Sequence, residues 1–337
     1  MASKPSVCIV SPVAQRAHDG VAVTAERWRQ WLEPVADVAV APEWTGASDE
    51  VLIALHASGS AESVARFAHA HPRRPLALVL TGSDVARDID ANASACAALS
   101  HATHLIVRQP GALGRLGDSQ QARARVIEPS APRRVMRNKA RTRFDVAHAA
   151  PLCAESDPMT LFTAIQALPP DSPVRLLHMG TAYQEDLAEA ARLTQTQHKQ
   201  YQWLGEPPPY DMRRWIARAR TVVHCDAVDG AALAVVDAVC SHVPVLATRL
   251  PVHEGLLGID YEGFFDAGDA QALAELLQRV SSDEPFLRML ARHCEAQAPR
   301  FAPEIEGAAV RNLLHEMLGD EPRTVRYRTP APLRAHL

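Results

Sequence analysis

One stretch of the sequence, residues 222–248, restricts the possible folds more than any other. An apolar β-branched segment is followed by an acidic loop, by apolar residues with helical spacing up to Cys240, and by a second apolar segment at 244–247. Asp229 and Gly230 mark the predicted start of the helix. Strand, helix and strand form a βαβ unit with parallel strands, whose carboxyl ends border a crevice that binds anionic ligands. The stretch therefore predicts both a fold class and the place of a site.

The same alternation of short apolar strands and amphipathic helices fills most of the chain. The first half predicts helices at 23–32 and 62–69 and strands at 6–11, 38–40, 51–55, 76–80, 104–107 and 125–127. The second half predicts further strands at 144–147, 174–180 and 201–205, and helices at 157–168, 183–194, 270–280, 285–297 and 303–318. This pattern indicates an α/β protein with parallel sheets.

A chain of 337 residues, 47% of them hydrophobic, is long enough for two cores. Residues 123–143 carry eight basic side chains against one acid, Glu128, and this composition predicts an interdomain linker. We therefore expect an N-terminal domain over 1–122, the linker, a C-terminal domain over 144–300, a closing helix over 301–320 and a mobile tail over 321–337.

Charge and missing motifs exclude several functions. A net charge of -4 argues against a nucleic-acid or membrane-surface binder, and no apolar run is long enough for a membrane span or a signal peptide. Six cysteines without a C-x-x-C pair predict reduced thiols in a cytoplasmic protein. The 15 histidines show no close metal-ligand spacing, so we expect no metal. The absence of a P-loop, a G-x-G-x-x-G and a G-x-S-x-G disfavours kinase-like, nicotinamide-dependent and hydrolase functions.

Short segments from Gly20 to about Glu306 resemble one family in their order. They are residues 23–28, 54–57, 60–63, 80–84 and 87–89 in the first half, and 178–180, 201–206, 244–249, 255–265 and 298–301 in the second. The chain resembles the two-domain family 4 glycosyltransferases, and within them the selenosugar synthases of bacterial selenoneine biosynthesis. The resemblance implies the GT-B fold, in which two Rossmann-like domains with parallel sheets face a cleft. It also implies metal-free transfer of a sugar from UDP-N-acetylglucosamine to selenophosphate, a small anionic acceptor.

The resemblance and the strand ends together indicate site residues. The expected donor-binding residues are His148, Gly180, Gly205, Glu206, Asp229, Gly230, Ala231 and Asp237, with Asp237 on the ribose hydroxyls. On the acceptor side we expect Gly20, Thr24, Thr81 and Gly82, and as catalytic residues His56 and Asp84, which follow apolar strands. Structural roles stay open for several of these: a turn for Asp84 and the glycines, a helix cap for Asp229, an ordinary helix acid for Asp237, and buried histidines.

The chain departs from the family pattern where cations are expected. The family's arginine and lysine positions are occupied by Val21, Ala22, Ser58, Gly59, Ala150 and Ser156. Departure of UDP leaves negative charge on a diphosphate, and loss of one preorganised donor typically costs about 3 kcal/mol. Two hypotheses follow: a glycosyltransferase in which other cations, such as Arg175 or Arg249, take over, or an inactive GT-B protein with a binding or assembly role. A donor with a less charged leaving group is a third option.

Overall fold

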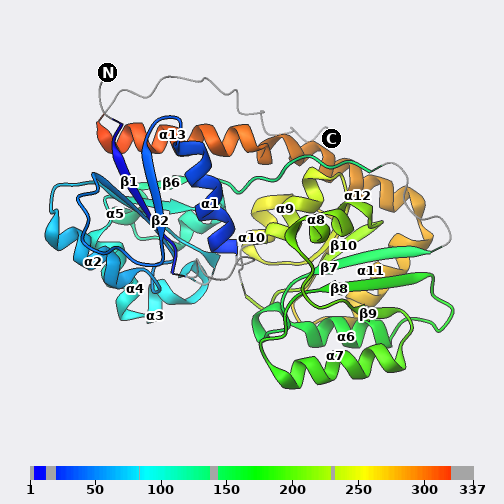
Figure 1. The fold of residues 1–337 in the computed structure, drawn as a ribbon. Coiled ribbons are helices and arrows are strands. Elements are labelled where there is room, and N and C mark those ends of the chain that lie inside the picture. Colours follow the sequence, from blue (N-terminus) through cyan, green and yellow to red (C-terminus); the bar gives the residue numbers. More distant parts are fainter. Residues whose placement is uncertain (1–3, 13–19, 83, 137–142, 229–231, 320–337) are drawn as a thin grey trace.

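The computed structural model describes residues 4–12, 20–82, 84–136, 143–228 and 232–319, which form two α/β halves side by side (Figure 1). The predicted tail over 321–337 lies outside these residues. Each half contains one six-stranded sheet in which all strand pairs are parallel. The predicted α/β class with two parallel sheets is confirmed.

The first sheet has the strand order β2-β1-β3-β4-β5-β6. Its strands are β1 (Ser6–Val10), β2 (Asp37–Ala41), β3 (Val51–Leu55), β4 (Leu76–Val79), β5 (His104–Val107) and β6 (Ala124–Val126). Its helices are α1 (Gly20–Leu32), α2 (Ala61–Ala70), α3 (Ile89–Ala91), α4 (Ala93–His101) and α5 (Asp118–Gln121). Alternate residues of β1 enter opposite cores, Cys8 with α2 and α4, and Ile9 with α1, because successive side chains of a strand point to opposite faces.

The second sheet has the order β12-β11-β10-β7-β8-β9. Its strands are β7 (Phe144–Ala149), β8 (Val174–Met179), β9 (Tyr201–Trp203), β10 (Thr221–His224), β11 (Val245–Thr248) and β12 (Phe264–Phe265). Its helices are α6 (Pro158–Gln166), α7 (Glu185–Gln197), α8 (Pro209–Arg218), α9 (Leu233–Cys240), α10 (Pro251–Leu257), α11 (Ala270–Ser282) and α12 (Glu284–Gln297). Strands β7 and β10 are buried throughout except for Asp145, as expected for strands covered by helices on both faces.

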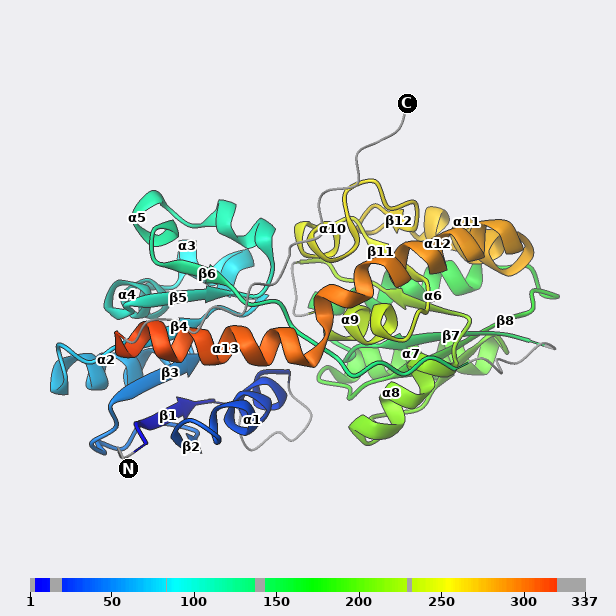
Figure 2. The same cartoon turned by 90° about the horizontal axis from the view of Figure 1, so that it is seen from above.

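The last helix, α13 (Pro303–Leu318), returns to the first domain, along which it lies in both views (Figures 1 and 2). Its residues Val310, Leu313 and Leu314 share a core with Trp28 of α1. The first half therefore needs the end of the chain to cover one face of its sheet. The connection between the halves is also shorter than the predicted linker over 123–143, because residues 124–126 pair with β5 as the edge strand β6.

Three helices of the second domain differ from the expectation. Helix α9 begins at Leu233, after Ala232 at a φ of 43°, and the predicted start at Asp229 and Gly230 lies outside the described residues. Helices α8 and α10 were not predicted; each begins directly at a proline, which suits the first turn of a helix. All six cysteines are unpaired, as predicted. None of the described helices has the length and apolar character that a bilayer span requires.

Candidate active site at the domain interface

The strand orders locate two crevices. In each sheet the chain reverses its direction of winding, between β1 and β3 in the first sheet and between β7 and β10 in the second. Ligands of open α/β sheets bind outside the carboxyl ends of the strands at such points. The segment after β3 contains His56, β7 contains His148 near its end, and β10 ends at His224. Both predicted site histidines therefore lie next to a crevice.

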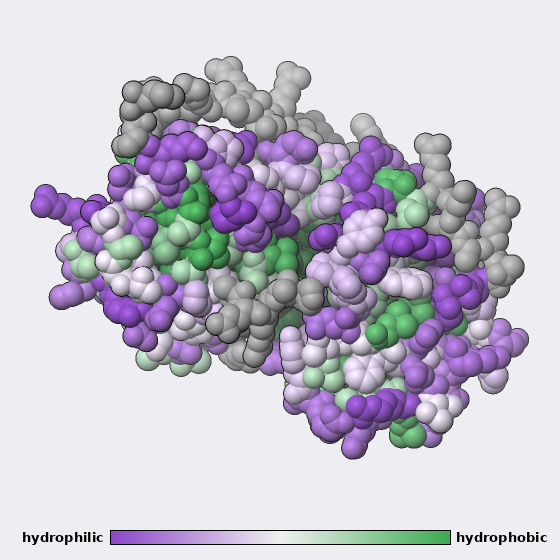
Figure 3. Space-filling view, viewed as in Figure 1, coloured by the Kyte–Doolittle hydropathy of each residue, from purple (hydrophilic) through white to green (hydrophobic). Residues whose placement is uncertain are grey.

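A pocket of about 70 Å³ lies between the two domains. It is lined by all four residues predicted on the acceptor side, Gly20, Thr24, Thr81 and Gly82, and from the second domain by Leu233 of α9 and by Val252 and Leu256 of α10. The domains touch at Gly20, where an added Cβ would lie 3.0 Å from Leu233 Cδ1. Figure 3 shows the groove between the two halves, with hydrophobic residues gathered beside it on the first domain.

The predicted catalytic pair lies together at the carboxyl edge of the first sheet. His56 Nδ1 is 3.3 Å from Asp84 Oδ1, and the His56 side chain is 26% exposed. His56 has a φ of 70°, a sparsely populated value for a residue with a side chain, and residues held in such conformations cluster at active sites and ligand clamps. Asp84 is fully buried and accepts hydrogen bonds from the backbone N–H groups of Ala57 and Thr81 and from the Thr81 hydroxyl. Asp84 therefore holds the backbone of Ala57 and Thr81 together at this edge, and of the two predicted catalytic side chains only that of His56 is partly exposed.

Three predicted donor-side residues meet at the ends of β8 and β9. The Gly180 N–H donates to the Gly205 carbonyl at 2.7 Å, and the Thr181 hydroxyl donates to the Glu206 carboxylate. A Cβ on Gly180 would lie 1.9 Å from the Ala150 carbonyl oxygen, so only glycine allows this close approach. Gly205 has a φ of 68°, which also favours glycine. The glycines thus hold two loops together at the carboxyl edge of the second sheet.

The remaining donor-side expectations have different outcomes. Asp229, Gly230 and Ala231 lie outside the described residues. His148 is completely buried, with Nδ1 3.0 Å from the Val223 carbonyl oxygen, and burial lowers its pKa to about 4 despite that hydrogen bond. This complete burial favours the structural role that the sequence left open for His148.

Asp237 in α9 is partly buried and close to a group of arginines. Burial raises the pKa of its carboxyl group to about 6, although the charges of Arg213, Arg27 and Arg134 act in the opposite direction. These arginines come from α8, from α1 and from the segment between the domains. Three elements distant in sequence therefore bring positive charge to one carboxylate, an arrangement that no local motif reveals.

Both cations named as replacements are paired with carboxylates. Arg175 lies near the amino end of β8, opposite the crevice, and its Nε donates to Asp145 at 2.8 Å. Arg249 is 45% exposed and paired with Glu254. The positions of the missing cations, Ala150 and Ser156, are 7% and 5% exposed.

Sequence reasoning missed Arg108 and Gln109, which line the interdomain pocket. Arg108 Nη2 donates to Glu306 at 2.7 Å, whereas its Nη1 and Gln109 Oε1 are buried without a hydrogen-bond partner among the described residues. Their position in the sequence could have indicated a site, because they directly follow the predicted strand at 104–107, just as Thr81 and Gly82 follow β4 closely. Arg108 is the cation that the structure places in the pocket lining.

Comparison with known proteins agrees with this geometry. Residues 147–283 match the model of a family described as Glycosyl transferases group 1, over most of the second domain. No curated protein matches the chain in sequence.

Solved structures resemble the whole chain. The Anabaena protein HepE, in complex with UDP and glucose, has a TM-score of 0.69 at 14% identity, covering 93% of this chain and 100% of HepE. A sucrose-phosphate synthase from Thermosynechococcus elongatus has a TM-score of 0.76 at 14% identity, covering 94% of this chain and 99% of the synthase. The pneumococcal O-GlcNAc transferase GtfA, in complex with UDP and GlcNAc, has a TM-score of 0.64 at 16% identity, covering 80% of this chain and 57% of GtfA. At such low identity these likenesses establish the fold alone, and the predicted GT-B arrangement is confirmed.

Proposed function

We propose that the chain is a glycosyltransferase that binds a UDP-sugar against its second domain and transfers the sugar to a small anionic acceptor beside the first. The observation that carries the proposal is the pocket at the domain interface, which gathers all four acceptor-side residues opposite the domain that matches Glycosyl transferases group 1. HepE and GtfA, which share the fold, are complexes with UDP and a sugar, and they support UDP as the nucleotide. The family resemblance favours UDP-N-acetylglucosamine as donor and selenophosphate as acceptor.

On the donor side, the proposal assigns contacts to the loops of Gly180, Gly205 and Glu206, to residues 229–231 and to Asp237. On the acceptor side it assigns His56, positioned by Asp84, to contact with the reacting groups. Arg108 supplies positive charge at the pocket, because its Nη1 is a buried donor without a partner among the described residues. This charge partly replaces the family's cations.

The test has two stages. Calorimetric titration with UDP and with UDP-N-acetylglucosamine measures the donor site, and UDP release with selenophosphate measures transfer. We expect saturable binding of both nucleotides and UDP release that requires the acceptor. His56→Gln should lower kcat while nucleotide binding stays unchanged, whereas His101→Gln, on the exposed end of α4, should alter neither.

The outcomes test the donor, the transfer reaction and the acceptor separately. If neither nucleotide binds, the glycosyltransferase assignment is wrong. Binding without UDP release for any small anionic acceptor favours the inactive GT-B protein that the lost cations suggested. Release with another anion but not with selenophosphate overturns the acceptor alone.

A further inference from the structure

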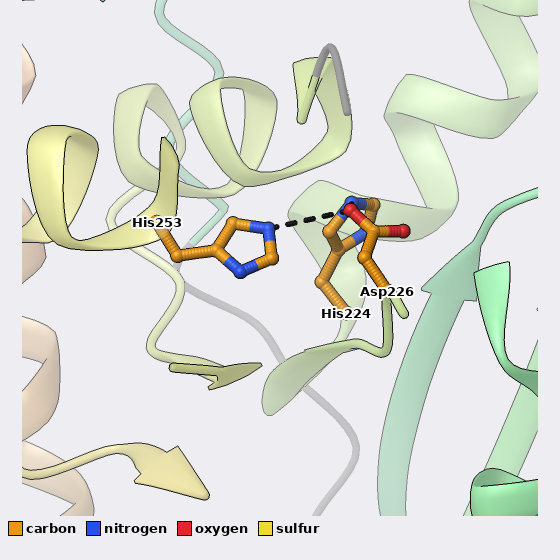
Figure 4. Close-up of side chains that lie close together, drawn as sticks. All are labelled: His224, Asp226 and His253. Carbon is orange, nitrogen blue, oxygen red and sulfur yellow. Dashed lines mark ion pairs between the residues drawn. The ribbon is translucent and has the colours of Figure 1, made fainter. Parts of the chain in front are cut away.

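Four histidines form a buried row along the carboxyl edge of the second sheet. They are His178 of β8, His148 of β7, His224 of β10 and His253 of α10, with ring centroids 4.5, 6.5 and 5.2 Å apart in that order. Asp226 follows β10, and its carboxylate contacts both of the last two; Figure 4 shows it beside the His224 ring, with the ion pair to His253 dashed. We propose that His224, Asp226 and His253 bind a divalent transition-metal ion, with zinc as the best match. This inference does not depend on the proposed transferase function.

The distances suit such an ion. Asp226 Oδ2 is 3.2 Å from His224 Nε2 and 3.5 Å from His253 Nε2, and the three ligand atoms lie within 4.8 Å of one another. Zinc bound at about 2.0–2.2 Å in tetrahedral geometry separates its ligands by roughly 3.3 Å. Two imidazoles with one carboxylate favour a transition metal over magnesium or calcium, which prefer oxygen ligands.

The hydrogen bonds of His253 leave its second nitrogen facing the carboxylate. His253 Nδ1 is 2.7 Å from the Thr248 carbonyl oxygen, which only accepts, so Nδ1 carries a proton. In the neutral ring Nε2 then presents a lone pair to Asp226 Oδ2; no hydrogen bond joins either atom to a described residue, although Oδ2 lies at ion-pair distance from both His224 and His253. A bound cation satisfies both atoms, and a backbone carbonyl on the far nitrogen is the usual support of a metal-binding histidine.

The burial of the three side chains also supports a bound ion. His253, His224 and Asp226 are 0%, 6% and 7% exposed, so water does not readily compensate their unpaired atoms. A second cluster of His56, Asp84 and Asp88 also has the spacing of metal ligands, but the carboxylate of Asp84 is already satisfied by hydrogen bonds. Only the cluster of His224, Asp226 and His253 combines ligand spacing with unsatisfied buried atoms in the described part of the chain.

The ion would join two elements that are separate in sequence. His224 and Asp226 belong to β10 and the loop that leads toward residues 229–231, and His253 belongs to α10, which lines the interdomain pocket. Three protein ligands leave one coordination position of the ion open, and we expect the ion to hold Asp226 and the end of β10 against α10 beside the donor crevice.

The experiment uses the untagged full chain, stripped with a chelator, loaded with Zn²⁺ and desalted. Elemental analysis should find about one equivalent of zinc, and Zn²⁺ should raise the Tm by several degrees. Asp226→Asn and His253→Gln should lose the bound zinc and the Tm shift, and His101→Gln should keep both. Zinc near zero in the unmodified chain would overturn the proposal. Retention of zinc in both ligand variants would place the ion elsewhere and overturn it as well.

Cobalt provides a test that needs no variant. Co²⁺ in the unmodified chain should give the visible bands of a low-symmetry site with nitrogen and oxygen ligands. A thiolate-to-cobalt charge-transfer band would indicate Cys225, the buried neighbour of His224, as a ligand and would contradict the proposed ligand set.

Discussion

Replacing Glu306 by glutamine removes a buried negative charge that joins the two ends of the chain. The Glu306 side chain is 1% exposed and is paired with Arg27 and Arg108, which are 21% and 16% exposed. The carboxylate also accepts hydrogen bonds from Trp28 Nε1 at 3.0 Å and from the Ser130 N–H at 2.8 Å. Glutamine keeps the shape, but it leaves two neighbouring guanidinium groups without their counter-charge.

The expected cost follows from that burial. Breaking a buried ion pair from one side costs about 3–5 kcal/mol, whereas an exposed pair contributes about 0–1 kcal/mol. Glu316→Gln on the same helix is the matched control, because Glu316 and its partner Arg125 are 38% and 44% exposed. Urea unfolding followed by tryptophan fluorescence and circular dichroism measures both variants. Equal losses of unfolding free energy for Glu306→Gln and Glu316→Gln would refute the reasoning.

The pH dependence of the unfolding free energy gives a second test of Glu306→Gln. Burial alone would raise the pKa of Glu306, but the charges of Arg108 and Arg27 and the hydrogen bonds of Trp28 and Arg108 outweigh it, so the pKa is lowered from 4.5. The unfolded chain therefore binds this proton more tightly than the folded chain. The stabilisation is complete above the unfolded pKa and is lost as the pH falls below about 4.5. Glu306→Gln should lack this part of the acid destabilisation.

Three further predictions concern the site. Gly180→Ala should destabilise the chain and weaken UDP binding more than Gly205→Ala does, because the added Cβ at position 180 meets the Ala150 backbone. At Gly205 the cost is only about 1–2 kcal/mol of strain in the left-handed backbone. Equal effects of the two variants in thermal melts and UDP titrations would contradict this. Burial raises the pKa of Asp237 from 3.8 to about 6, so its protonation stabilises the folded chain below pH 4, and this stabilisation is lost as the pH rises to about 6. Asp237→Asn should abolish this fall in the unfolding free energy, which amounts to about 3 kcal/mol. A fall that persists in the variant would disprove the assignment. Arg108→Gln should raise the KM for the anionic acceptor about tenfold or more. Arg27→Gln is the control, because it also removes a contact with Glu306. If both variants change the KM equally, the effect comes from lost stability and not from lost acceptor binding.

Local patterns in the sequence were enough to predict the layers of the fold. Apolar runs with period two or helical spacing predicted β3, β5, α2 and α13 within a few residues, because local periodicity records which faces are buried. The same patterns placed Thr81, Gly82 and His56 after strands, and parallel strands bring such positions to one edge. Local signals failed at α9, because this helix begins only at Leu233.

Which of these residues lie together depends on how the distant segments pack. The row of histidines collects side chains from β7, β8, β10 and α10, and no spacing along the chain announces that His253 faces Asp226. Burial likewise assigned Asp84 a structural role and left Arg108 with an unsatisfied donor. Hydrogen-bond satisfaction and desolvation depend on neighbours brought in from distant segments, so these properties come into being only when the sheets and the crossing helix α13 pack together.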